Sequence, residues 1–156
     1  MQIRKFKLSY EVSAARLHRN TIRVVNSKDY SPKIIHVWSG RTSARKFRET
    51  ASKCFRLVAL EKGKIVGFAD ISKEGDFWGL YVHKSYIGKG IGKVLLRKVE
   101  EKAAELGVKR LKVKATITAK SFYERQGYMV LKKALYEASF KDETVMIGIF
   151  LMEKAI

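Results

Sequence analysis

The glycine-rich segment "YIGKGIGKVLL", residues 86–96, constrains the fold of this chain more than any other stretch. Gly88, Gly90 and Gly92 alternate there between a strand-like run, "FWGLYV" at 77–82, and an apolar run with helical spacing. Glycines at this density indicate a backbone that bends sharply or closely approaches another group. The segment therefore predicts a tight turn from a strand into a helix.

The helix that follows this turn begins near Ile91. Its first amide N–H groups have no partner within the helix and lie at the positive end of the helix dipole, so they attract an anion. Lys89 and Lys93 add two charges at the same place. The segment predicts a pyrophosphate site, and a glycine-rich turn without a ligand is the alternative.

Two common phosphate-binding loops do not match this segment. A Walker loop would need glycine at position 87, where the chain has Ile, and Ser or Thr at position 94, where it has Val. The dinucleotide fingerprint, counted from Gly88, would need glycine at position 93, where the chain has Lys.

The composition is that of a globular protein, with 46% apolar and 31% charged residues. A length of 156 residues fits one domain over 1–156. The apolar stretch "VMIGIFLM" is far shorter than the ~20 residues that cross a bilayer, and the N-terminal residues do not resemble a signal peptide. A single cysteine excludes an intrachain disulfide and a cysteine-rich metal site. We expect a cytoplasmic protein without a metal and without a membrane partner.

The charge is strongly positive: 33 Lys and Arg face 15 Asp and Glu, for a net charge of +18. Such a surplus indicates an anionic ligand, a nucleic-acid surface or a charge that keeps the protein soluble. The cations are spread along the chain, which favours a generally positive surface over a dedicated nucleic-acid arm. A positive surface suits acidic or neutral small molecules better than polyamines.

Apolar periodicity, caps and turns predict the order of the elements. Ser9 and Ser31 are the expected N-caps of the first two helices, and Pro32 is the expected first residue of the second. Strands are expected at 3–8, 55–61, 65–72, 77–82, 110–115, 128–139 and 144–153, and helices at 10–25, 32–40, 42–53, 91–106 and 118–126.

The helix at 91–106 has the length of a crossover between two parallel strands, whereas the hairpins elsewhere are antiparallel. The chain is therefore predicted to be an α/β protein of mixed type. We expect a mostly antiparallel sheet of about seven strands with helices on both faces.

Two segments resemble signatures of the GCN5-related N-acetyltransferase (GNAT) superfamily. "LYVHKSYIGKGIGKVLL" is similar to its acetyl-coenzyme A signature: Gly90 and Gly92 fill the small positions, and Ile87 stands where Arg or Gln is usual. "TITAKSFYERQGY" resembles the second signature in Ala119, Phe122, Tyr123, Glu124 and Gly127, with Thr116 in place of Asn. The predicted order of elements is similar to the family fold, and "SKDYSPKIIHVW" resembles poorly characterised members.

The resemblance implies an acetyltransferase that moves an acetyl group from acetyl-CoA to an amine of a small molecule or peptide, in a ternary complex. It implies contacts with the cofactor from Leu80, Tyr81, Val82, Gly88, Lys89, Gly90, Ile91, Gly92, Lys93, Thr116, Ala119, Phe122 and Tyr123. The strand would contact the pantetheine arm, and 88–93 would hold the pyrophosphate. A homodimer is also expected, because relatives are often dimers.

Catalysis requires a neutral amine, a donor for the oxyanion and a proton for the leaving thiolate. Tyr123 matches the family's acid, and its alternative is a core aromatic of a short helix. Asp76 resembles the position of the family's base, and its alternative is a turn aspartate; His83 or a relayed water are other candidates for the base. A backbone N–H near Leu80 or Tyr81 is the expected oxyanion donor.

The candidate residues of the acceptor pocket are Tyr30, Trp38, Trp78 and Tyr86, with ordinary core packing as the alternative. Two further functions remain open. One is a CoA-binding regulatory or catalytically degenerate module, and the other is a nucleic-acid binder that uses the positive charge; no sequence-specific nucleic acid is expected.

Overall fold

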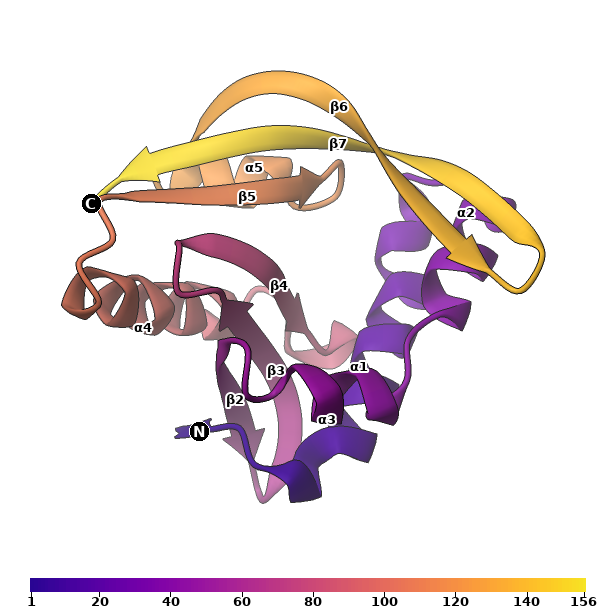
Figure 1. Ribbon diagram of the computed structural model, residues 1–156. Coiled ribbons are helices and arrows are strands. Elements are labelled where there is room, and N and C mark those ends of the chain that lie inside the picture. Colours follow the sequence, from indigo (N-terminus) through magenta and orange to yellow (C-terminus); the bar gives the residue numbers. More distant parts are fainter.

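The computed structural model describes residues 1–156, which fold around one seven-stranded sheet (Figure 1). The strands are β1 (Gln2–Lys5), β2 (Phe55–Glu61), β3 (Lys64–Ile71), β4 (Asp76–Val82), β5 (Arg110–Thr116), β6 (Met129–Phe140) and β7 (Glu143–Ala155). The helices are α1 (Glu11–Val24), α2 (Pro32–Gly40), α3 (Ala44–Thr50), α4 (Ile91–Glu105) and α5 (Lys120–Arg125).

The order of the strands across the sheet is β1-β2-β3-β4-β5-β7-β6. All neighbouring strands are antiparallel except β4 and β5, which α4 connects as a crossover. This is the mixed, mostly antiparallel sheet that the sequence predicted, with its single parallel pair at the predicted place.

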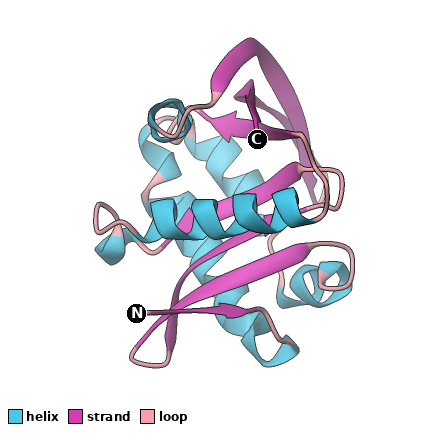
Figure 2. Cartoon of the chain, turned by 90° about the vertical axis from the view of Figure 1, so that its left-hand side faces the viewer, coloured by secondary structure: helices cyan, strands magenta, loops and turns pink.

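The helices cover both faces of the sheet, as predicted. On one face, α4 packs against β2, β3 and β4, and Figure 2 shows this long helix in front of the strands. The apolar residues of α4 share a core with Tyr123 of α5. On the other face, α1 contacts β3 and β4, whereas α2 contacts β6 and β7. The long β6–β7 hairpin reaches across the top of the molecule in Figure 1 to α2.

The start of the first helix differs from the prediction. Ser9 is not its cap, because it lies within a 3₁₀ turn at Leu8–Tyr10, and the N-cap is Tyr10, which makes no side-chain cap bond. The first strand is also shorter than expected. The cap of α2 is confirmed, since the Ser31 hydroxyl accepts a hydrogen bond from the Ile34 N–H over 3.3 Å.

The parallel strands β4 and β5 pair only at their beginnings, where Asp76 lies opposite Lys112 and Phe77 opposite Val113. Beyond Phe77 the two strands separate, so the β5-facing edge of β4 has no neighbouring strand. A β-bulge at Trp78 lies at this point, because Asp70 and Ile71 of β3 pair with Gly79 and Phe77. Bulges bend a strand and increase its twist. The separation opens the sheet at its centre.

None of the helices combines the length and the apolar character needed to cross a membrane.

Docking of α4 on the sheet should dominate the stability of this half of the molecule. Leu95 is fully buried, and a Cβ added to Gly67 of β3 would lie only 3.1 Å from its Cδ1 atom. Leu95→Ala should lower the free energy of unfolding by about 2–5 kcal/mol, because it leaves a cavity in a closely packed interface. Arg97→Ala, on the exposed face of α4, should change it by less than about 0.5 kcal/mol. Urea unfolding of both variants tests this, and equal losses would contradict it.

Candidate active site

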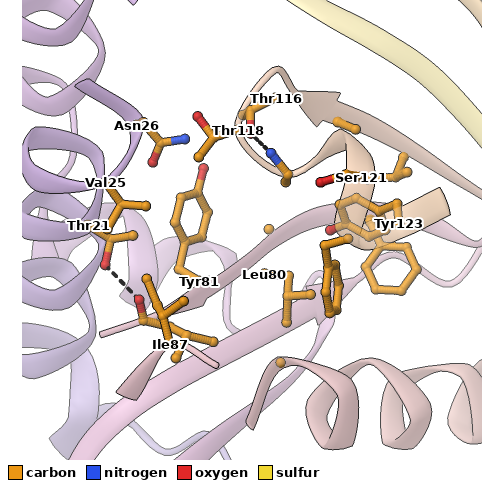
Figure 3. Close-up of a pocket in the computed structure, with 18 of the residues that line it drawn as sticks. Thr21, Val25, Asn26, Leu80, Tyr81, Ile87, Thr116, Thr118, Ser121 and Tyr123 are labelled. Atoms are coloured by element: carbon orange, nitrogen blue, oxygen red, sulfur yellow. Dashed lines mark hydrogen bonds between the residues drawn. The ribbon is translucent and has the colours of Figure 1, made fainter. Parts of the chain in front are cut away.

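A cleft of ≈ 480 Å³ occupies the opening between β4 and β5 (Figure 3). Most of the residues predicted to contact a cofactor line it: Leu80, Tyr81, Val82, Gly88, Gly90, Gly92, Lys93, Thr116, Ala119, Phe122 and Tyr123. The structure therefore brings residues of the two sequence motifs together in the lining of one cavity.

The N-terminus of α4 forms one end of this cleft. None of the backbone N–H groups from Ile87 to Lys93 donates a hydrogen bond to a protein acceptor, and the first helical bond runs from the Val94 N–H to the Gly90 carbonyl. Gly88 and Gly90 have φ angles of 82° and 86°, which side-chain-bearing residues rarely adopt. The glycines thus shape the tight turn from strand to helix that the sequence predicted, and they leave its amides without protein partners.

Two of the predicted cofactor residues do not line the cleft. Ile91 is 5% exposed and packs into the core between α4 and the sheet. The Lys89 ammonium lies 5.0 Å from the centre of the Tyr86 ring. Ile87, which stands at the usual Arg or Gln position of the motif, does line the cleft.

Tyr123 of α5 is 4% exposed, and its phenolic oxygen faces the open centre of the cleft (Figure 3). Its ring packs edge-on against those of Phe77, Phe122 and Tyr128. Burial raises the pKa of Tyr123, so the phenol retains its proton at neutral pH. The burial of the Tyr123 ring is that of a core aromatic. Its phenolic proton nevertheless remains available to a group bound in the cleft, because the oxygen faces the cleft.

Thr116, at the usual Asn position of the second motif, holds the turn into α5. Its hydroxyl and its carbonyl both accept from the Ala119 N–H, over 3.2 and 3.1 Å. The Thr118 Oγ1 atom is buried in the cleft wall without a hydrogen-bond partner.

Sequence reasoning missed the wall that α1 and the two residues after it contribute. Thr21, Val25 and Asn26 line the cleft, and the Thr21 hydroxyl donates to the Val82 carbonyl over 3.3 Å (Figure 3). This contact joins residues that are far apart in the sequence, and no local pattern marks it.

A second cavity, of ≈ 300 Å³, lies on the other side of β4. Both cavities are lined by Trp78, Gly79 and Tyr81, so β4 is the wall between them. A Cβ at Gly79 would lie 3.2 Å from the Asp70 Oδ1 atom and 3.0 Å from the Tyr81 ring. A side chain at position 79 would therefore crowd the place where the cavities meet.

Asp70 of β3 is a carboxylate in the wall of the second cavity that the sequence analysis did not select. It is 4% exposed, its Oδ2 atom accepts from Arg56 Nε over 2.8 Å, and its Oδ1 atom has no hydrogen-bond partner. Burial raises the pKa of Asp70, although the neighbouring Arg56 opposes that shift. An aspartate inside the apolar run "IVGFADI" was the signal that could have identified it.

Other predicted residues lie away from both cavities. Asp76 is exposed at the first position of β4, and Trp38 is 5% exposed in a core cluster with Tyr30 against it. The Tyr30 hydroxyl donates to the Gly148 carbonyl and accepts from the Ile117 N–H. His83 Nδ1 accepts from the Ser85 N–H. Among the candidate acceptor residues, Trp78 lines both cavities and Tyr86 lines the cleft.

Comparisons with known proteins show the family to which this chain belongs. A family model for the acetyltransferase (GNAT) domain matches residues 26–142. The uncharacterised N-acetyltransferase YafP of Escherichia coli (strain K12) is 28% identical over 138 residues, which are 88% of this chain and 87% of that protein. The chain belongs to the GNAT acetyltransferase family, as the two motifs predicted.

Solved structures show the same fold. A GCN5-related N-acetyltransferase from Rhodopseudomonas palustris has a TM-score of 0.92 at 24% identity, covering 99% of this chain and 95% of that one. The PaiA N-acetyltransferase from Thermoplasma acidophilum, solved in complex with coenzyme A, has a TM-score of 0.81 at 21% identity, covering 99% and 98%.

His18, which lines the second cavity, predicts how the free energy of unfolding depends on pH. Burial and the nearby Arg41 and Lys46 lower the pKa of His18 to about 3, below its ordinary value of ~6.5. Because the folded protein keeps this ring neutral, its contribution to stability is fully present above pH ~6.5 and is lost as the pH falls towards about 3. The slope should reach up to about 1.4 kcal/mol per pH unit.

Urea unfolding between pH 7.5 and pH 5 measures this slope. His18→Gln should flatten it, and His36→Gln, which changes an exposed histidine, should leave it as in the wild type. Equal slopes in the wild type and His18→Gln would contradict the assignment.

Proposed function

We propose that the chain is an acetyl-CoA-dependent N-acetyltransferase that acts on a primary amine by direct attack in a ternary complex. The observation that carries the proposal is the run of unbonded amides from Ile87 to Lys93, in which Ile87, Gly88, Gly90, Gly92 and Lys93 line the cleft, in a chain of the GNAT family. The Thermoplasma acidophilum neighbour, solved with coenzyme A, supports the same cofactor.

The residues of the cleft fit coenzyme A. The amides at the start of α4 and the Lys93 ammonium would hold the pyrophosphate, because oriented N–H groups and a cation suit an anion. The β5-facing edge of β4 beyond Phe77 has no strand partner, so its main chain is available to the amide groups of a pantetheine arm. When bound, acetyl-CoA supplies an acetyl group activated as a thioester.

Side chains of this protein would protonate the leaving thiolate and deprotonate the amine. Tyr123 holds a phenolic proton at the centre of the cleft, where a leaving thiolate needs one. The amine must lose a proton before it can attack. Asp70 is a better candidate for this task than Asp76, because it lines the second cavity beside Gly79, where the two cavities meet.

Cofactor binding can be tested through the turn itself. Gly90→Ala places a side chain at a φ of 86°, strains the turn and should weaken acetyl-CoA binding by roughly 10-fold, as ~1 kcal/mol of strain is released by moving the amides. Gly107→Ala is a matched control at the other end of α4, with a φ of 82° and the same open space around its Cβ. It should lose similar stability and keep its affinity.

Calorimetry with acetyl-CoA and with acetyl-pantetheine, which lacks the phosphates, makes the test direct. The wild type should prefer acetyl-CoA, and the preference should shrink in Gly90→Ala. Equal affinities of the wild type for both compounds would contradict a pyrophosphate site.

Turnover can be tested at Tyr123. Tyr123→Phe should lower kcat by about 10²- to 10⁴-fold, the usual contribution of a general acid, and should leave the Kd for acetyl-CoA unchanged. Tyr128→Phe is the control: its hydroxyl donates to Glu100 over 2.8 Å outside the cleft, so stability should fall and kcat should not. Thiol release with a panel of amines provides the rates. A wild type that binds acetyl-CoA and acetylates no amine would favour a degenerate module.

A further inference from the structure

We propose that the second cavity is the acceptor site and that it selects a primary amine that also carries an anionic group, a carboxylate or a phosphate. The inference rests on the proposed acetyltransferase function and specifies its substrate class. Arg41 and Lys46 would bind the anion, and Asp70 would bind the amine near Gly79.

The first observation is a pair of cations without ion-pair partners in the lining of the second cavity, of which Arg41 is half-buried and Lys46 is exposed. Arg41, which follows α2, and Lys46 of α3 both line the second cavity, and neither forms an ion pair with any carboxylate of the chain. Arg41 Nη2 donates to the Tyr136 hydroxyl over 3.2 Å, which orients the guanidinium from the β6 side. Burial, and then the charge of Arg41, lower the pKa of Lys46. Two cations so close together attract an anion between them.

The only carboxylate in the lining of this cavity does not neutralise these cations. Asp70 is committed to Arg56, whose guanidinium also donates to the Phe47 carbonyl and the Thr50 hydroxyl, each over 2.9 Å. The Arg56–Asp70 pair is almost completely buried and is neutral as a unit. His18 adds no charge at neutral pH, since its pKa is low. The cavity therefore keeps a net positive charge from Arg41 and Lys46.

The second observation is the free oxygen of Asp70. Asp70 lines the cavity, and its Oδ1 atom is buried without a donor, which is costly for a carboxylate. An ammonium or amine N–H at the Gly79 end of the cavity would satisfy this oxygen. That end adjoins the cleft through Trp78, Gly79 and Tyr81, so an amine bound there is next to the cofactor cleft.

These features describe a small zwitterionic acceptor. A volume of ≈ 300 Å³ suits a small molecule or one terminal residue of a peptide. The net charge of +18 attracts such an anion and repels a polyamine.

Matched pairs of acceptors that differ only in the anion provide the test. Glycine and methylamine, lysine and cadaverine, and phosphoethanolamine and ethanolamine separate a carboxylate from a phosphate. With saturating acetyl-CoA, the anionic member of at least one pair should have a kcat/KM about 10-fold or more above that of its partner. The pair that shows the preference identifies the anion.

Single substitutions test whether Arg41 and Lys46 cause the preference for anionic acceptors. Arg41→Gln and Lys46→Gln should each lower kcat/KM for the preferred acceptor by roughly 10- to 100-fold, with less than about a 2-fold change for its neutral partner. Arg45→Gln removes the same charge from the exposed face of α3, where Arg45 pairs with Glu49, and should change neither rate. The proposal is overturned if neutral amines react as fast as anionic ones in every pair, or if Arg45→Gln loses as much as Arg41→Gln.

Binding measurements keep this inference separate from the proposed function. Calorimetric titration of the same pairs into the protein saturated with coenzyme A should show tighter binding of an anionic member and its loss in Arg41→Gln. If binding behaves in this way and no amine is acetylated, the acceptor site stands and the acetyltransferase proposal falls. If amines are acetylated without any preference, the enzyme stands and the anion site falls.

Discussion

The separation of β4 from β5 is the constraint on which the rest of the structure depends. The two strands share only the pairs at Asp76 and Phe77, and the bulge at Trp78 then bends β4 away. A parallel pair that stops so early leaves main-chain groups in the middle of a sheet without strand partners, which proteins normally avoid. The cleft is the result, and its open edge is chemically incomplete without a ligand that can form amide-like hydrogen bonds.

The crossover helix gives this opening its charge and its rigidity. Leu95, Leu96 and Val99 are almost completely buried, so α4 is fixed on the sheet by its packing. The free amides at its N-terminus are held in place by that core, and the turn through Gly88 and Gly90 only directs them. A helix N-terminus fixed in this way would lose little entropy on binding an anion, because the order is already present in the free protein.

The sequence predicted those parts of the site that are local, and it missed those that depend on contacts over a long distance. The glycine turn, α4 and the motif around Tyr123 are continuous stretches whose spacing reports their structure directly. Thr21 and Asp70 enter the site from elements whose own patterns are those of an ordinary helix and strand. Asp76 was selected because a turn aspartate beside a strand is visible in sequence, but pairing alone determines that it lies at the far end of β4.

The two cavities also explain the unusual sequence of β4. A strand between two cavities presents different side chains to each of them. Where the cavities meet, it needs a residue without a side chain. Gly79 meets this need, since even a Cβ there would press on the Asp70 carboxylate and the Tyr81 ring. Tyr81 meets the opposite need: its ring lines both cavities, and it lies 4.3 Å from the His18 ring and 5.5 Å from the Phe68 ring, measured between ring centres. Under the proposed function, Gly79 would let the cofactor and the acceptor approach each other, and the packed ring of Tyr81 would close the strand beside it.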